Sequence, residues 1–212
     1  MTHVGNDIVD LCSPYVTGKS RDKKFIQRVL TPEEQKVVLN AANPDSLLQV
    51  YWAARETAYK VIVKTNPDVS SAPRRYRVLL DSPENGRKLR GVVKTPAADV
   101  FITVLRHRGF IHCSGATLFC AAGKIIYGIE KITDHAPPDF CRSSEAVSCL
   151  ARTFAKEKIA AALSVNADNI TITKTDGRNE ALFPEVYINM RKTDIGISLS
   201  HDGRYVAFAL AF

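Results

Sequence analysis

The chain lacks any apolar run long enough to span a bilayer, and its first seven residues have neither the basic start nor the apolar core of a signal peptide. We therefore expect a cytoplasmic protein that does not attach to membranes. Cysteine is scarce, since the five residues are an odd number without C-x-x-C spacing, which argues against a disulfide framework and against a zinc site. We interpret the cysteines as reduced packing residues.

Acidic residues are also in deficit. The 22 Asp and Glu residues are outnumbered by 29 Lys and Arg residues, which gives a formal charge of +7 and favours an anionic partner. Charge alone does not choose among nucleic acid, an acidic protein and a phosphorylated small molecule. A nucleic-acid-binding protein has only this charge in its favour, because the sequence contains no recognisable nucleic-acid-binding motif. With 212 residues, 45% of them hydrophobic, the chain can form one large globular domain or two small ones.

Side-chain periodicity and turn signals predict an α+β protein with short strands. The segment from Thr31 to Glu34 has the form of a capping box and predicts a helix to about Leu39. Ser46 is the expected N-cap of a longer helix that ends near Lys64. The other predicted elements are a helix at 144–163, a hairpin turn at 83–86, and strands at 4–11, 76–80, 91–94, 100–105, 110–122, 125–132, 170–174, 185–189, 196–200 and 205–211.

The two parts of the chain, 1–123 and 124–212, look like diverged copies of one unit. Three landmarks occur in the same order: residues 5–7 align with 128–130, residues 52–56 with 153–157, and residues 111–115 with 199–203. We expect two subdomains related by a pseudo-two-fold axis, each with a small antiparallel sheet packed against a long helix. Coincidence stays open as an alternative, because the segments between the landmarks differ in length.

The two copies differ in chemical content. In this alignment Cys113 takes the place of His201, and Glu130 and Glu157 take the places of Asp7 and Glu56. The sequence therefore predicts one complete site, built from the carboxylates of the first half and the Ser-His turn of the second. The reciprocal site would be a degenerate remnant, and we expect its neighbour His112 to be structural or weakly functional.

The segment from Val50 to Lys60 is the most informative stretch of the first half. In a helix Trp52, Glu56 and Lys60 lie four residues apart along one stripe, so a carboxylate and an ammonium lie beside an aromatic ring. The simple interpretation is a solvent-facing ion pair next to a packing tryptophan. The functional interpretation depends on a second acid, Asp7, in the first predicted strand.

Four motifs resemble those of the 4'-phosphopantetheinyl transferase superfamily. The opening strand resembles the family's Gly-x-Asp-Ile motif, and Phe25 to Glu34 resembles a segment of the acyl-carrier-protein synthases. Trp52 to Lys60 is similar to the Trp-Ala-x-Lys-Glu-(Ala/Ser)-x-x-Lys signature, and Ser198 to His201 is similar to the Ser-x-Ser-His turn. The middle of the chain, about 74–140, matches only through the repeat.

The resemblance implies transfer of the phosphopantetheine arm of coenzyme A to a serine of an apo carrier protein, with release of adenosine 3',5'-bisphosphate. By this resemblance Asp7 and Glu56 would bind Mg²⁺, Glu56 would be the base, and Lys60 would steady the phosphates and protonate the leaving group. The residues expected to bind coenzyme A, besides Lys60, are Ser200, His201, Arg142, Lys174 and Arg178.

Three features depart from parts of the family. Val9 stands where the surfactin-synthetase type has a third acid, so two protein carboxylates are expected to bind the metal. Arg55 replaces the usual lysine, a change of little consequence if Arg55 faces solvent or phosphate. The order of the two halves is also the reverse of that type, with the carboxylates in the first half.

A basic segment around Phe25 is expected to dock an acidic carrier protein. It contains Arg21, Lys24 and Arg28, although such a run of charge is also typical of a solvated face. The leading hypothesis is a monomeric, Mg²⁺-dependent transferase of the holo-acyl-carrier-protein synthase type. The alternative is a diverged module that binds coenzyme A or a carrier without transferring the group.

Overall fold

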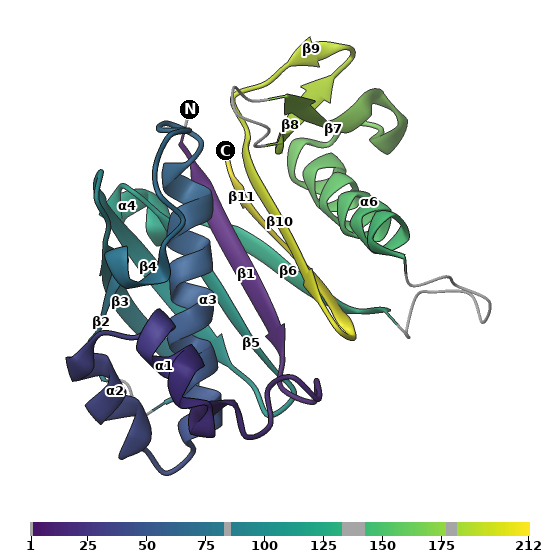
Figure 1. The fold of residues 1–212 in the computed structure, drawn as a ribbon. Coiled ribbons are helices and arrows are strands. Elements are labelled where there is room, and N and C mark those ends of the chain that lie inside the picture. The colour runs from purple at the N-terminus through teal and green to yellow at the C-terminus, as the bar shows by residue number, and fades with distance from the viewer. Residues whose placement is uncertain (1, 83–85, 133–142, 177–181) are drawn as a thin grey trace.

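The computed structural model describes residues 2–82, 86–132, 143–176 and 182–212 (Figure 1). In these ranges the strands form one five-stranded and two three-stranded antiparallel sheets. The elements of the first half are β1 (Val4–Asp10), η1 (Lys19–Arg21), α1 (Lys23–Val29), α2 (Pro32–Leu39), α3 (Pro44–Ile62), η2 (Pro73–Arg75), β2 (Arg77–Leu80), β3 (Lys88–Lys94), β4 (Asp99–Arg106), β5 (Phe110–Ala116) and α4 (Phe119–Ala122).

The second half begins with β6 (Ile126–Lys131) and the long helix α6 (Ser144–Leu163). It continues with η3 (Ala167–Asn169), β7 (Ile170–Asp176), β8 (Leu182–Ile188), β9 (Arg191–Lys192), β10 (Gly196–Asp202) and β11 (Tyr205–Ala211). The predicted α+β class with antiparallel sheets is confirmed. The boundary predicted at 123–124 falls between α4 and β6 and stays a prediction.

The first sheet has the strand order β1-β5-β4-β3-β2, and α3 packs on the face formed by β1 and β5 (Figure 1). Twelve of the 19 residues of α3 are buried, which makes this helix the centre of the largest apolar core. Gly5 permits the close approach of helix and strand, because a β-carbon there would lie 2.3 Å from the carbonyl oxygen of Thr57. The strand that carries Asp7 is therefore fixed against the helix that carries Glu56.

The second half repeats this arrangement in part. In both halves the first strand pairs with the last, β1 with β5 and β6 with β11, and the last strand pairs with the one before it. The helix α6 packs against β10 and β11, while β7, β8 and β9 form a separate small sheet beside β10. Figure 1 shows β1 lying next to β10, so the two halves meet along this pair of strands.

The strand register corrects two alignments made from the sequence. Asp7 was matched with Glu130, but Asp7 lies opposite Cys113 in β5, and Gly128 takes the corresponding place opposite Phe208 in β11. Cys113 was matched with His201, but Cys113 lies in β5, the last strand, whereas His201 lies in β10, the strand before the last. Both hairpins turn through two residues, with His107 opposite Phe110 in one and Asp202 opposite Tyr205 in the other. The counterpart of His201 is therefore Arg106, at the end of β4.

Most predicted elements are observed, but the short helix α1 was not predicted, and there are three further local errors. The N-cap of α3 is Asn43, whose side chain accepts a hydrogen bond from the N–H of Ser46, so the helix starts earlier than expected. The strand predicted at 110–122 ends at Ala116, and the rest forms α4. The prediction missed β9, and the expected turn at 83–86 lies mostly outside the described residues.

The cysteine interpretation is correct only in part. Among the free cysteines that the structure describes, Cys113 is buried, whereas Cys12 and Cys149 are exposed and do not serve as packing residues. In the described ranges no helix combines the length and the apolar character needed to cross a membrane.

Candidate functional site

A cavity of about 340 Å³ lies where β1 and α3 meet the hairpin between β10 and β11. We call it the carboxylate cavity. Its lining joins Asp7 and Glu56 from the first half to His201 and Asp202 from the second. The other lining residues are Ile8, Val9, Ser13, Tyr15, Val16, Lys19, Phe25, Gln49 and Trp52. The structure thus brings together residues that are about 150 to 190 positions apart in the sequence.

Asp7 and Lys60 form an ion pair in this region. The Lys60 Nζ donates to Asp7 Oδ1 at 2.8 Å and to the carbonyl oxygen of Asn6 at 3.0 Å. The Asp7 side chain is only 13% exposed. Burial raises the pKa of the Asp7 carboxyl, although the Lys60 ammonium acts in the opposite direction. Lys60 therefore reduces the cost of burying a negative charge at the wall of the cavity.

Glu56 is the second acid of the cavity wall. Burial and the nearby negative charge of Asp7 raise the pKa of the Glu56 carboxyl, and Lys60 opposes this shift. Among the described residues none donates a hydrogen bond to its carboxylate. Trp52, one turn earlier on α3, lines the same cavity. The stripe predicted from the helical spacing thus faces a cavity, which disfavours the interpretation as a simple surface ion pair.

His201 and Ser200 are adjacent in sequence but lie in different environments. The exposed imidazole of His201 lines the carboxylate cavity, and partial desolvation together with the Lys60 ammonium lowers its pKa. Ser200 is 5% exposed, and its hydroxyl accepts a hydrogen bond from Asn6 Nδ2 at 2.8 Å. Ser198 likewise accepts from the backbone N–H of Asn6 at 3.0 Å. The two serines thus hold β10 against β1, and only His201 of this turn reaches the cavity.

The other predicted coenzyme A ligands are less central. Lys174 is exposed on β7, and its ammonium contributes to the lowered pKa of His201. Arg142 and Arg178 lie outside the described residues.

The residues of the expected reciprocal site do not share a described cavity. Glu157 is exposed on α6, and Glu130 lies on β6. His112 is 1% exposed, packs against the ring of Tyr127 at 5.1 Å and lies 3.4 Å from Asn6 Nδ2. Burial lowers the pKa of His112 to about 3, so this ring is neutral at physiological pH. These surroundings agree with a structural role for His112.

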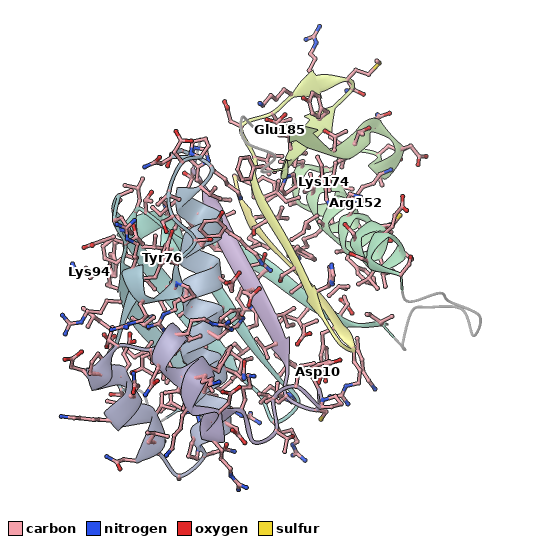
Figure 2. All side chains as sticks on the ribbon, viewed as in Figure 1. Asp10, Tyr76, Lys94, Arg152, Lys174 and Glu185 are labelled. Carbon is pink, nitrogen blue, oxygen red and sulfur yellow. The ribbon has the colours of Figure 1, made fainter. Side chains whose placement is uncertain are left out.

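The sequence analysis missed the contacts that hold the β10–β11 hairpin against β1. Arg204 donates from Nε and Nη2 to the Asp10 carboxylate at 2.8 and 2.7 Å, and its backbone N–H also donates to this carboxylate. The Asp202 carboxylate accepts from the N–H of Asp10 at 2.8 Å. Gly203 has a φ of 51°, and a β-carbon there would lie 2.5 Å from the Asp10 carboxylate. Figure 2 shows Asp10 at the end of β1, beside this hairpin.

The predicted docking segment borders the carboxylate cavity. Phe25 of α1 packs against Trp52 of α3, with ring centroids 5.7 Å apart. Two cations lie over the Phe25 ring, Lys19 at 4.4 Å and Arg28 at 5.5 Å. The other named basic residues of this surface, Arg21 and Lys24, are exposed. An aromatic platform with several positive charges therefore lies next to the two acids.

A second cavity, of about 260 Å³, has Lys60 and Lys64 in its lining. It is lined by Tyr59, Lys60, Val63, Lys64, Phe183, Pro184, Ser198 and Leu199. The Lys64 ammonium donates to the carbonyl oxygens of Val4 and Ile197, at 2.6 Å each, and so joins β1 to β10. Burial and the nearby Lys60 lower the pKa of Lys64 to about 7. This contact was not predicted, because Lys64 lies just after α3, in the turn where the helix was expected to end.

Arg55 does not face solvent or phosphate, so the interpretation that allowed for this is wrong. The side chain is buried, forms an ion pair with Glu34 of α2, and donates to the carbonyl oxygens of Tyr51 and Pro73. Glu34 also accepts from the N–H groups of Thr31 and Val78. Arg55 therefore connects α3 to α2 and to the start of the sheet.

Asp7 and Glu56 fit a hard divalent cation. Both are oxygen donors on one cavity wall, and the raised pKa of Glu56 is partly due to Asp7, a repulsion that a cation between them would relieve. No group of three or more Asp, Glu, His and Cys side chains in the described part of the chain is arranged to hold a metal.

Residues 3–97 match the family model described as the 4'-phosphopantetheinyl transferase superfamily. This span includes Asp7, α1, Glu56 and Lys60, whereas His201 lies outside it. Comparison with curated proteins finds no match for the chain.

Proposed function

Because the chain carries a domain of the 4'-phosphopantetheinyl transferase superfamily, we propose that it transfers the phosphopantetheine group of coenzyme A to a serine of an apo carrier protein. The observation that supports this most directly is the carboxylate cavity, where Asp7 and Glu56 of the first half face His201 of the second. The proposed subtype is that of the holo-acyl-carrier-protein synthases, with a monomer that supplies both sides of the site. The product would be adenosine 3',5'-bisphosphate.

In this proposal Asp7 and Glu56 hold Mg²⁺, which would supply positive charge at the diphosphate of coenzyme A when bound. Glu56 accepts the proton of the carrier serine, a role suited to a carboxyl whose pKa is raised above its ordinary value. Lys60 lines the second cavity and donates to Asp7 of the carboxylate cavity, so its ammonium can contact a phosphate of coenzyme A. Its ammonium is also the proton donor for the departing bisphosphate.

His201 provides a neutral imidazole that can donate one N–H to a phosphate oxygen, since its pKa is lowered. We propose that the nucleotide part of coenzyme A lies in the cavity of Lys60, Lys64 and Phe183, in reach of Lys174 on β7. The pantetheine arm would then extend towards Glu56. Ser200 supports this arrangement through Asn6, by holding β10 in place.

The carrier protein would dock on the surface formed by Phe25, Trp52 and the surrounding cations. Its acidic character complements Lys19, Arg21, Lys24 and Arg28, and the aromatic pair offers an apolar contact at the centre. This surface borders the carboxylate cavity, so a serine on the docked carrier would face Glu56.

The test is incubation of the protein with coenzyme A, Mg²⁺ and an apo carrier protein, followed by intact-mass measurement of the carrier. We expect a mass gain equal to one phosphopantetheine group, and we expect Glu56→Gln to abolish it. Glu157→Gln is the matched control, because it makes the same change at the corresponding position of α6, where the carboxylate is exposed. Binding of coenzyme A without any mass gain would favour the non-catalytic alternative, and loss of transfer in Glu157→Gln alone would reverse the choice of half-site.

A further inference from the structure

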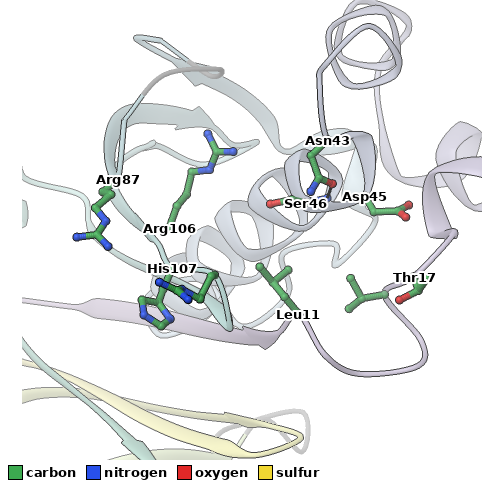
Figure 3. Close-up of a pocket in the computed structure, with 10 residues that line it drawn as sticks. Leu11, Thr17, Asn43, Asp45, Ser46, Arg87, Arg106 and His107 are labelled. Atoms are coloured by element: carbon green, nitrogen blue, oxygen red, sulfur yellow. Dashed lines mark hydrogen bonds between the residues drawn. The ribbon is translucent and has the colours of Figure 1, made fainter.

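A third cavity, of about 620 Å³, lies between the β4–β5 hairpin and the N-terminal end of α3 (Figure 3). We call it the arginine cavity. It is lined by Leu11, Val16, Thr17, Asn43, Asp45, Ser46, Arg87, Arg106, His107 and Arg108. Val16 is the one residue that it shares with the lining of the carboxylate cavity. The two cavities therefore adjoin at Val16 and otherwise have different linings.

Basic side chains are the largest group in the lining of the arginine cavity. Three arginines and a histidine line it, and Figure 3 shows Arg87, Arg106 and His107 on one side with Asn43 and Ser46 across from them. No carboxylate in the described ranges forms an ion pair with Arg87 or with Arg108. These two guanidinium groups therefore have hydrogen-bond donors available for a ligand.

The negative charge of Asp45, which also lines the cavity, does not neutralise the arginines. Its carboxylate accepts hydrogen bonds from the N–H groups of Gly18 and Ser20, at 2.7 Å each, and so holds the turn that precedes α1. In Figure 3 its side chain points away from Arg87 and Arg106. The acid that borders the cavity is thus already hydrogen-bonded to the backbone.

The strand register gives a second, independent indication. Arg106 occupies the position in the β4–β5 hairpin that His201 occupies in the β10–β11 hairpin. In each half a basic side chain therefore leaves the end of the corresponding strand and lines a cavity. The first half thus also has a basic residue at this position of its hairpin, although it contributes its carboxylates to a different cavity.

We propose that the arginine cavity binds a phosphorylated small molecule at a site separate from the carboxylate cavity. Guanidinium groups form paired hydrogen bonds to phosphate oxygens, so the phosphate lies at Arg87 and Arg108. The apolar side chains of Leu11 and Val16 offer a wall for the organic part, and the volume of the cavity exceeds that of a phosphate alone. This site goes beyond the proposed transfer reaction and does not depend on it.

The probe is inorganic pyrophosphate, titrated into the full-length protein without divalent cations and followed by isothermal titration calorimetry. We expect saturable binding that weakens about tenfold in Arg87→Gln and in Arg108→Gln, since each substitution removes charge-assisted hydrogen bonds. Arg77→Gln is the matched control, because Arg77 is an exposed arginine on the edge strand β2 and does not line the cavity. The control is expected to bind like the wild type.

The variant His201→Ala separates this site from the carboxylate cavity. In the His201→Ala background we expect Arg87→Gln and Arg108→Gln to weaken pyrophosphate binding by the same factor as in the wild type. The proposal is overturned if no saturable binding occurs, if Arg77→Gln weakens binding as much as the two cavity variants, or if only His201→Ala lowers the affinity. Both cavity residues are exposed, so their substitution should leave the far-ultraviolet circular dichroism spectrum unchanged.

Discussion

The contact between Asp10 and Arg204 predicts a linked loss of stability and activity in Arg204→Gln. Asp10 is almost fully buried, with 3% of its side chain exposed, and Arg204 supplies two side-chain hydrogen bonds at 2.7 and 2.8 Å. The substitution leaves Asp10 with the backbone N–H groups of Arg204 and Cys12 as donors. Burial alone would raise the pKa of Asp10, but the hydrogen bonds from Arg204 and from the backbone lower it below its ordinary value.

Breaking a buried ion pair by removing one partner costs about 3–5 kcal/mol. The Arg204 side chain is 33% exposed, so water can partly replace it, and we expect a loss of about 2–3 kcal/mol in the free energy of unfolding. Asp202 and His201 lie on the same hairpin, so looser attachment to β1 should lower kcat of the transfer reaction more than it changes KM for the carrier.

Urea denaturation at pH 7 and steady-state transfer kinetics measure the two effects, with Arg77→Gln as the control for loss of one arginine charge. The pH dependence adds a check of sign. Because the pKa of Asp10 is lowered in the folded state, its stabilisation is present above about pH 4 and is lost as the pH falls through the folded-state value. The difference between wild type and Arg204→Gln should therefore shrink below about pH 4. A difference under about 0.5 kcal/mol at pH 7 would refute this reasoning, since that is within the range of ordinary surface substitutions.

Three further outcomes follow from the contacts described above. Arg55→Met should lower the free energy of unfolding by about 3 kcal/mol, because it leaves Glu34 buried without its cation; a loss below about 1 kcal/mol in urea denaturation would contradict the structural role of Arg55. Arg28→Glu should raise KM for the carrier several-fold with little change in kcat, whereas the control Lys36→Glu, on the exposed side of α2, should not; equal effects would argue against docking at Phe25. The pKa of Lys64 is lowered to about 7 in the folded protein, so between about pH 7 and about pH 10 the folded protein binds fewer protons than the unfolded chain. The free energy of unfolding should therefore rise with pH over this range, and Lys64→Met should remove that rise. An unchanged rise in the variant would contradict the lowered pKa of Lys64.

The local elements were predictable because their signals are local. The capping box at Thr31 is observed with both of its hydrogen bonds, since its two partners lie three residues apart. The position of Trp52 and Glu56 on one face of the helix was also predictable, because residues four apart on a helix share a face. In contrast, the N-cap of α3 was placed at Ser46, although Asn43 offers the same chemistry three residues earlier, before a proline suited to the first helical turn.

Contacts between residues far apart in the sequence could be predicted only where both residues belonged to recognisable motifs. The motifs around Asp7, Glu56 and His201 indicated that the two halves share one site, and the structure places these residues around one cavity. No motif indicated that Arg55 pairs with Glu34. An arginine in a helical pattern gives no sign of burial, because charged side chains are seldom buried unless paired, and its partner Glu34 appeared to be only the last residue of a capping box.

The alignment of Cys113 with His201 failed for a physical reason that bears on function. A match of short segments compares residue types but does not identify the strand, and apolar residues follow both segments. Hydrogen-bond register settles the matter, because each hairpin turn is two residues long and Arg106 must then correspond to His201. The first half therefore did not lose the basic side chain at this position. This residue is Arg106, which lines the arginine cavity. The first half therefore carries the acids of the carboxylate cavity and also a basic residue at the position that corresponds to His201.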